Sequence, residues 1–161
     1  MNTHRIIEAA LEYVGRGWAV VPVKPRSKKP RPNEWTKFRI DHQEISKHFR
    51  EADNIGLLLG EPSGGLVDVD LDCPEALALA GDHLPETQSI FGRPPKRGSH
   101  HLYVARGAKS RRFADPLGGM LVELRSSGAM TIFPESVHPR GEAITWESRG
   151  EPTETSRVGR R

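Results

Sequence analysis

The chain has 161 residues and a mass of 17.9 kDa, which is enough for one domain, or for one domain with a tail. No apolar stretch is long enough to span a bilayer and the N-terminus lacks a signal-peptide core, so we expect a cytoplasmic protein with no membrane partner. The single cysteine, Cys73, excludes an internal disulfide and a cysteine-cluster zinc site, and the net charge of +3 is too small to identify a partner.

The first half of the sequence predicts two helices and three strands. Residues 3–16 carry apolar side chains near a period of 3.6 and run into glycines, which predicts a helix. Residues 18–23 form an apolar β-type run that stops at a loop rich in proline and lysine. Asp41 and Glu44 have the spacing of a capping box and predict a short helix. Buried strands are then expected at residues 54–59 and 66–71, joined by a glycine-rich turn.

The second half predicts one helix and several strands. The alanine- and leucine-rich segment 74–80 is expected to be helical. Strands separated by glycine or proline are expected at residues 101–105, 120–124, 129–133 and 143–146. Apolar periodicity ends after Trp146, so we expect one domain over residues 1–147 and a disordered tail over 148–161. The fold class is therefore α+β, with a mixed or antiparallel sheet and flanking helices.

Charged residues are segregated along the chain. Residues 61–86 contain acids but no lysine or arginine, whereas residues 93–112 contain bases but no acid. A second basic segment, residues 24–39, is interrupted only by Glu34. An acidic block flanked by basic segments could hold metal ions beside a polyanion, and the alternative is ordinary segregated surface charge.

The most informative segment is GLVDVDLD at residues 65–72. Alternation along a strand places Asp68 and Asp70 on one face, opposite an apolar face. Adjacent carboxylates repel each other unless a cation lies between them, and Mg²⁺ or Mn²⁺ would suit their oxygens. An exposed acidic strand end or a helix cap is the alternative, and we expect Asp72 to cap the following helix.

Two further segments carry polar side chains on strands. In KRGSHHLYV, Ser99 and His101 share one face, and together with Arg97 they would suit a triphosphate. A hydrogen-bonded structural histidine is the alternative for each histidine of this segment. In LVELRSSG, Glu123 and Arg125 share a face. They could be a metal-binding carboxylate beside a phosphate-binding arginine, and the alternative is an ion pair on the protein surface.

In this order, the motifs resemble the catalytic core of archaeo-eukaryotic primases, and most closely the bifunctional DNA primase/polymerase N-terminal domain. The residues that carry the resemblance are ALEYVGRGWAVVPV, KKP followed by a tryptophan, NIGLLLG, GLVDVDLD, GSHHLYV, VELRSSG and PESVHPRG…ITW. The similarity covers roughly Arg5 to Trp146. The resemblance implies a primase-like catalytic core as the fold.

The resemblance also implies roles for individual residues. Asp68, Asp70 and Glu123 would be the metal carboxylates, with Glu123 standing where this branch usually has aspartate. The residues implied to contact the nucleotide are Arg97, Ser99, His101, Arg125, Ser136 and His138, with His101 also counted as catalytic.

The function implied is template-directed nucleotidyl transfer to a 3′-hydroxyl, with two divalent ions, Mg²⁺ or Mn²⁺, as cofactors. The implied partners are nucleoside triphosphates and a DNA template and primer, together with a helicase or helical primase domain on another chain. Replication of a phage, plasmid or integrated element would fit. The basic residues expected to bind DNA phosphates are Lys28, Lys29, Arg31, Arg111 and Arg112.

Two other functions remain open at the level of sequence. A metal-dependent nuclease also uses paired carboxylates, but it does not need residues that bind a triphosphate. A catalytically silent module that binds nucleic acid or nucleotide is the second alternative. The absence of GxGxxG, GxxxxGK[ST] and HExxH argues against a cofactor enzyme.

Overall fold

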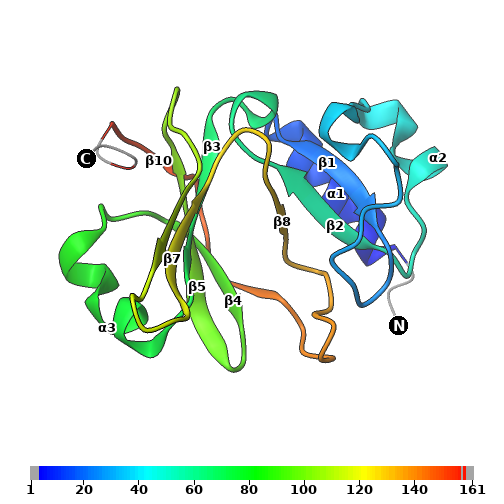
Figure 1. Ribbon diagram of the computed structural model, residues 1–161. Coiled ribbons are helices and arrows are strands. Elements are labelled where there is room, and N and C mark those ends of the chain that lie inside the picture. Colours follow the sequence, from blue (N-terminus) through cyan, green and yellow to red (C-terminus); the bar gives the residue numbers. More distant parts are fainter. Residues whose placement is uncertain (1–3, 157, 159–161) are drawn as a thin grey trace.

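The computed structural model describes residues 4–156 and 158, which form two β-sheets with helices on their outer sides (Figure 1). The smaller sheet has the strand order β1-β2-β8 and is antiparallel. The larger sheet has the order β6-β7-β3-β5-β4-β9, also antiparallel, and β10 joins β5 as a parallel partner. The predicted α+β class is confirmed.

The elements of the smaller sheet and its surroundings come mostly from the first half of the chain. They are α1 (Arg5–Gly15), β1 (Ala19–Val23), α2 (Ile45–His48), β2 (Asn54–Leu58) and β8 (Met130–Ile132). Single turns of 3₁₀-helix lie at Trp35–Lys37, His42–Glu44 and Glu61–Ser63. The capping box predicted from Asp41 and Glu44 is present, because each side chain accepts a hydrogen bond from the other residue's backbone.

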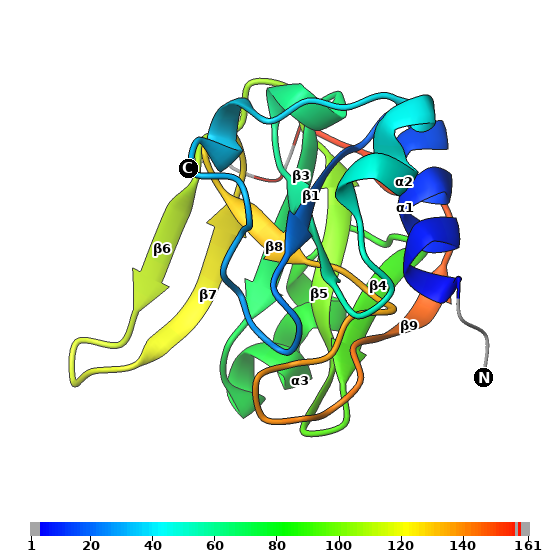
Figure 2. The same cartoon turned by 90° about the vertical axis from the view of Figure 1, so that its right-hand side faces the viewer.

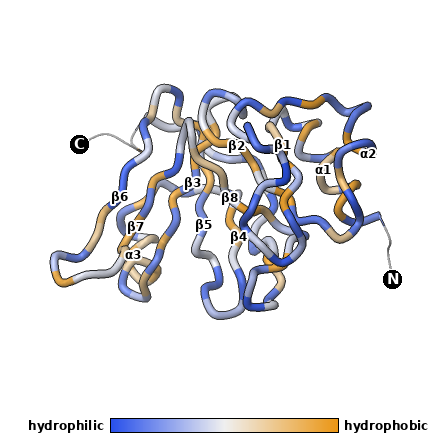
Figure 3. The backbone as a smooth tube through the Cα atoms, turned by 45° about the vertical axis from the view of Figure 1, so that its right-hand side comes forward, coloured by the Kyte–Doolittle hydropathy of each residue, from blue (hydrophilic) through white to orange (hydrophobic). Residues whose placement is uncertain are grey.

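The larger sheet, together with the helix that covers one of its faces, is built from residues 66–154. Its elements are β3 (Leu66–Leu71), α3 (Pro74–His83), β4 (Ser89–Arg93), β5 (Lys96–Val104), β6 (Arg111–Ala114), β7 (Met120–Arg125), β9 (Thr145–Arg149) and β10 (Thr153–Glu154). The strands β4 and β6 have no counterpart in the sequence prediction. Figures 2 and 3 show the loop between β6 and β7 projecting from the sheet, and Leu117 on it is 98% exposed.

Two clusters of buried apolar side chains lie on opposite faces of the larger sheet. One joins α1 to both sheets and contains Tyr13, Phe91 and Leu102. The other lies beneath α3 and contains Val67, Val69 and Leu71 of β3 with Tyr103 of β5. The predicted alternation along β3 is therefore confirmed, but both faces of the strand are buried, so its acidic residues do not lie at an exposed strand end.

The segment expected to be a disordered tail contains strands within its described part. Strand β9 continues to Arg149, and β10 pairs Thr153 with Tyr103 and Glu154 with Val104 of β5. Residues 157 and 159–161 lie outside the described residues, and the domain boundary at residue 147 stays a prediction. None of the described helices is long and apolar enough to cross a membrane.

Candidate functional site

A cavity of about 410 Å³ lies between the two sheets. One wall is formed by β3, β5 and β7 of the larger sheet, and the other by β8 of the smaller sheet. Its lining residues are Lys28, Asp70, Asp72, Gly92, Arg93, Lys96, Ser99, His100, Arg112, Glu123, Arg125, Gly128, Ala129, Met130, Thr131, Ile132, His138 and Ile144. The cavity thus collects polar residues from elements that are far apart in sequence.

Three carboxylates meet in this cavity. The antiparallel register places Asp70 opposite Glu123, and residues paired in this way project from the same face of the sheet. Asp72 extends the same row, since its backbone N–H donates to the carbonyl of Leu121 beyond the end of β3. One oxygen from each of Asp70, Asp72 and Glu123 lies within 4.8 Å of the others. Hard carboxylate oxygens at this spacing could hold a divalent cation.

The expected role of Asp72 as a helix cap is wrong. The residue that caps α3 is Cys73, whose sulfur accepts from the backbone N–H of Ala76 at 3.4 Å. The side chain of Asp72 turns the other way and accepts from Lys96 Nζ at 3.0 Å. The sequence did indicate this position, because Asp72 follows Asp68 and Asp70 at intervals of two residues and therefore projects from the same face of the strand.

Arg125 holds the other two carboxylates of the cluster. Its Nη2 lies 2.9 Å from Asp70 Oδ2 and 3.0 Å from Glu123 Oε2. Burial acts to lower the pKa of Arg125, but the surrounding carboxylates raise it above its ordinary value, so the side chain stays charged. The shared face predicted for Glu123 and Arg125 is confirmed.

Asp68 lies beneath the cluster and is not a member of it. Its carboxylate is fully buried, and its Oδ2 lies 2.8 Å from His100 Nδ1 and 2.8 Å from the hydroxyl of Thr131. The carboxylate that joins Asp70 and Glu123 is that of Asp72, where Asp68 was expected.

The histidine beside the carboxylates is His100, whereas His101, which was expected to contact the nucleotide and to be catalytic, is not among the residues that line the cavity. Strand β5 pairs antiparallel with β3, opposing His100 to Asp70 and His101 to Val69. Side chains alternate along a strand, so His101 projects from the face that carries Val69. The two histidines are adjacent in the sequence, and local pattern alone does not indicate which of them faces the carboxylates.

Charge and burial together shift the pKa values of Asp68, Asp70 and His100. Burial acts to raise the pKa of Asp68, but the charge of His100 and its hydrogen bond bring it below the ordinary value. Burial likewise acts to lower the pKa of His100, but the charge of Asp68 and their hydrogen bond raise it. For Asp70, burial raises the pKa. The Asp68–His100 contact is thus favoured as an ion pair.

Lysine and arginine side chains also line the cavity. Lys28, Arg93, Lys96, Arg112 and Arg125 reach the cavity from five separate segments, and they outnumber its three carboxylates. Arg112 Nε lies 3.3 Å from Glu123 Oε1. A surplus of fixed positive charge around carboxylates suits a polyanion bound together with a cation.

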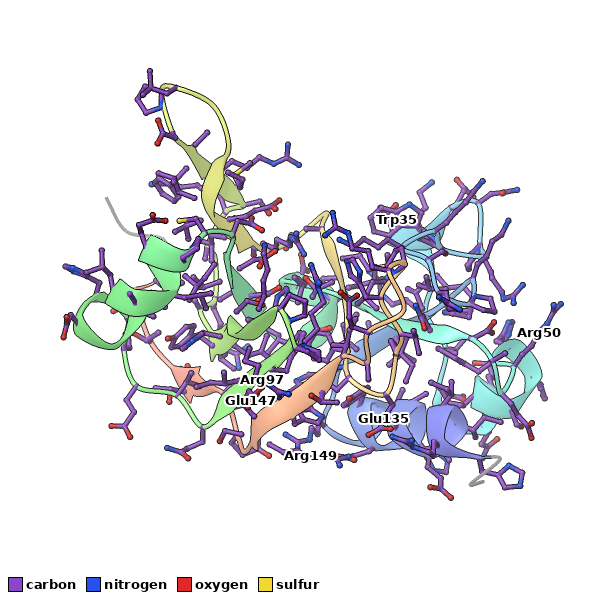
Figure 4. All side chains as sticks on the ribbon, turned by 90° about the horizontal axis from the view of Figure 1, so that it is seen from below. Trp35, Arg50, Arg97, Glu135, Glu147 and Arg149 are labelled. Atoms are coloured by element: carbon purple, nitrogen blue, oxygen red, sulfur yellow. The ribbon has the colours of Figure 1, made fainter. Side chains whose placement is uncertain are left out.

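Of the remaining residues expected to bind nucleotide, Ser99 and His138 line the cavity and two others do not. Arg97 lies against Glu147 of β9, at 3.5 Å, on an exposed surface (Figure 4). Ser136 is buried, and its hydroxyl accepts from the backbone N–H of Ile55 at 2.9 Å, which ties the loop after β8 to β2. The residue that takes the place expected for Arg97 is its neighbour, Lys96.

The residues expected to bind DNA are divided in the same way. Lys28 and Arg112 line the cavity, and Lys29 is exposed on the loop after β1. Arg31 is paired with the buried Asp53 at 2.5 Å, and Arg111 lines a separate hollow on the far face of the larger sheet. Trp35, the tryptophan that follows KKP in the family resemblance, is labelled in Figure 4 and is not among the residues that line the cavity.

A family model matches the chain. The model of the family described as bifunctional DNA primase/polymerase, N-terminal, matches residues 10–157, which is nearly the whole chain. No curated protein matches the sequence. The family match spans every residue that lines the cavity.

Proposed function

Because the chain belongs to the bifunctional DNA primase/polymerase N-terminal family, we propose that the cavity performs template-directed nucleotidyl transfer from a nucleoside triphosphate to a 3′-hydroxyl. The observation that carries this proposal is that one cavity holds both a carboxylate cluster and a surplus of cations. A nuclease would need the first feature but not the second.

We assign the divalent cations of the reaction, Mg²⁺ or Mn²⁺, to Asp70, Asp72 and Glu123. The fit rests on their convergent oxygens and on hard-ligand chemistry. When bound, such ions activate the attacking hydroxyl and stabilise the leaving pyrophosphate. Arg125 and Lys96 neutralise the same carboxylates in this structure, and both would be released to contact phosphate.

The side chains that would hold the triphosphate in this proposal are those of His100, Lys96, Arg125 and His138. All four line the cavity, and all can donate to phosphate oxygens when protonated. Their work is to hold the triphosphate in line and to balance its charge, which needs no covalent intermediate. Lys28 and Arg112 lie at the same cavity and would contact the DNA backbone in a salt-dependent manner.

The test is extension of a labelled primer–template with dNTPs or NTPs and Mg²⁺ or Mn²⁺. We expect Asp70→Asn and Asp72→Asn to lower the extension rate by at least about a hundredfold while leaving the fold intact. The matched control is Glu86→Gln, which removes one charge from an exposed side chain outside the cavity.

Each competing function predicts a different result. Undiminished extension by both aspartate variants would disprove the site assignment. Nucleotide binding without extension would identify a silent binding module, and metal-dependent shortening of the primer without dNTP or NTP would identify a nuclease.

A further inference from the structure

Asp68 is the one acidic residue of β3 that does not reach the cavity, yet it contacts groups that do. Its Oδ2 lies 2.8 Å from His100 Nδ1 and accepts a hydrogen bond from the Thr131 hydroxyl at 2.8 Å. Both of these residues line the cavity, whereas Asp68 itself is 0% exposed. The carboxylate is therefore placed to orient other side chains.

The first side chain that Asp68 orients is His100. The imidazole is stacked on Phe91, with 4.5 Å between ring centroids and 10° between planes. With Nδ1 fixed on Asp68, the Nε2 atom points toward the cavity and lies 3.7 Å from Asp70 Oδ1. A histidine whose Nδ1–H donates to a carboxylate has its ring orientation fixed and its other nitrogen free for a ligand.

The second side chain is Arg125, which Asp68 reaches through Thr131. Arg125 Nη1 donates to Thr131 Oγ1 at 3.1 Å, and the Thr131 hydroxyl in turn donates to Asp68. Arg125 Nη1 also lies 4.0 Å from Asp68 Oδ2. One buried carboxylate thus holds two cationic groups that face the cavity from two different strands.

We propose that Asp68 is a positioning residue, which holds His100 and Arg125 in the orientation that bound phosphates require and does not bind the cation. This inference rests on the function proposed above. Asp68 contributes no oxygen to the group formed by Asp70, Asp72 and Glu123. Asp68 is completely buried, and its Oδ2 makes both contacts, with His100 and Thr131, whereas Oδ1 has no hydrogen-bond partner among the described residues.

The first experiment separates metal binding from nucleotide binding. Mn²⁺ binding is measured by calorimetry without nucleotide, and binding of a fluorescent dNTP analogue is measured without metal. We expect Asp68→Asn to change the Mn²⁺ Kd by less than about twofold and to weaken nucleotide binding by about tenfold, the effect of a lost charge-assisted hydrogen bond. We expect Asp70→Asn to weaken Mn²⁺ binding by at least about tenfold.

A double-mutant cycle tests whether Asp68 acts through His100. In the His100→Gln background, Asp68→Asn should cause no further loss beyond its smaller effect through Arg125, whereas a merely structural role would add its full effect. If Asp68→Asn does not fold, Thr131→Val removes the link to Arg125 while keeping the carboxylate and the shape. That variant is then expected to weaken nucleotide binding and leave Mn²⁺ binding unchanged.

The outcomes distinguish this inference from the proposed function. Loss of Mn²⁺ binding in Asp68→Asn comparable to that in Asp70→Asn would make Asp68 a metal ligand and overturn the inference alone. Unchanged Mn²⁺ binding in both Asp70→Asn and Asp72→Asn would remove the proposed metal site instead. Full additivity in the cycle would also overturn the positioning role.

Discussion

At the residue scale, a side chain's existing partners decide what it can bind. Arg31 and Lys29 lie in the same basic loop, and the sequence gives both the same expected role in DNA binding. The guanidinium of Arg31, however, contacts Asp53 through two nitrogens, at 2.9 and 2.5 Å, and Asp53 has a fully buried carboxylate. Removing Arg31 would leave that carboxylate without a cationic partner, with only the backbone N–H of Arg50 donating to it at 2.9 Å, whereas Lys29 is exposed.

We therefore predict that Arg31→Gln lowers the free energy of unfolding by about 3 kcal/mol, because breaking a buried pair from one side is costly. Lys29→Gln, the matched control, should change it by less than about 0.5 kcal/mol. The measurement is urea unfolding at neutral pH. Equal stability of the two variants would show that the Arg31–Asp53 pair contributes nothing.

At the element scale, the β4–β5 hairpin carries two of the cationic residues of the site. Arg93 lies at its turn on β4, and Lys96 begins β5. The strands approach closely at Gly92, where a Cβ atom would lie 2.3 Å from the carbonyl oxygen of Lys96 and 2.7 Å from the backbone nitrogen of Gly98. Only glycine permits this approach, since backbone atoms cannot yield as a flexible side chain can.

We predict that Gly92→Ala costs about 1–3 kcal/mol of stability, as expected for a forced overlap in a packed region. The substitution should also weaken binding of nucleotide, because it displaces Lys96. The matched control is Gly81→Ala in α3, where nothing lies within 4 Å of the added methyl group and helix propensity improves by about 1 kcal/mol. Thermal unfolding and titration with a fluorescent dNTP analogue measure the two effects. If Gly92→Ala lowers neither the stability nor the affinity for nucleotide, the close approach of the two strands at Gly92 is contradicted.

At the scale of the whole molecule, the two apolar clusters lie on opposite sides of the larger sheet, and each contains one tyrosine. Tyr13 belongs to the cluster with α1 and donates a hydrogen bond to the carbonyl of Pro134. Tyr103 belongs to the cluster beneath α3 and donates to the carbonyl of Pro85. Burial raises the pKa of Tyr13 and raises the pKa of Tyr103 to about 12, so ionisation of either phenol opposes folding.

The consequence is a defined loss of stability in alkali. A folded-state pKa above the unfolded value of about 10 contributes stability that is full below pH 10 and is lost as the pH rises toward 12. We predict that absorbance of tyrosinate at 295 nm stays low through pH 10 and rises together with loss of the folded circular-dichroism signal. Tyr103→Phe should make the alkaline loss of stability less steep. Titration of half the tyrosine absorbance near pH 10 in a folded protein would contradict the burial of one cluster.

Several features of the site could be predicted from local pattern alone. The alternation of GLVDVDLD determines that Asp68, Asp70 and Asp72 share one face, because successive side chains of a strand project to opposite faces. The same rule relates Glu123 to Arg125 on the following motif. Local patterns also predicted α1 and the capping box at Asp41, since both depend on neighbours within a few residues.

Pattern could not decide between residues whose roles depend on distant partners. The choice between Asp68 and Asp72 as the third carboxylate follows from the distance of each to Glu123, which lies on another strand. The choice between His100 and His101 follows from the register of β5 against β3, and a shift of one residue would reverse it. Thr131 carried no sequence signal, because its contacts with Asp68 and Arg125 arise only where β8 of the smaller sheet meets the larger one.

The sequence by itself therefore determined the α+β class, the alternating faces of the strands that carry the motifs and the family that the chain resembles. These three features depend on local periodicity and on the order of the motifs, and both can be read from the sequence without the fold. The tertiary structure decided which acids converge, which histidine faces them and which basic residues are already paired. Those outcomes depend on strand register and on the approach of the two sheets, where contacts join residues far apart in sequence, as in the hydrogen bond from Thr131 to Asp68 across 63 positions.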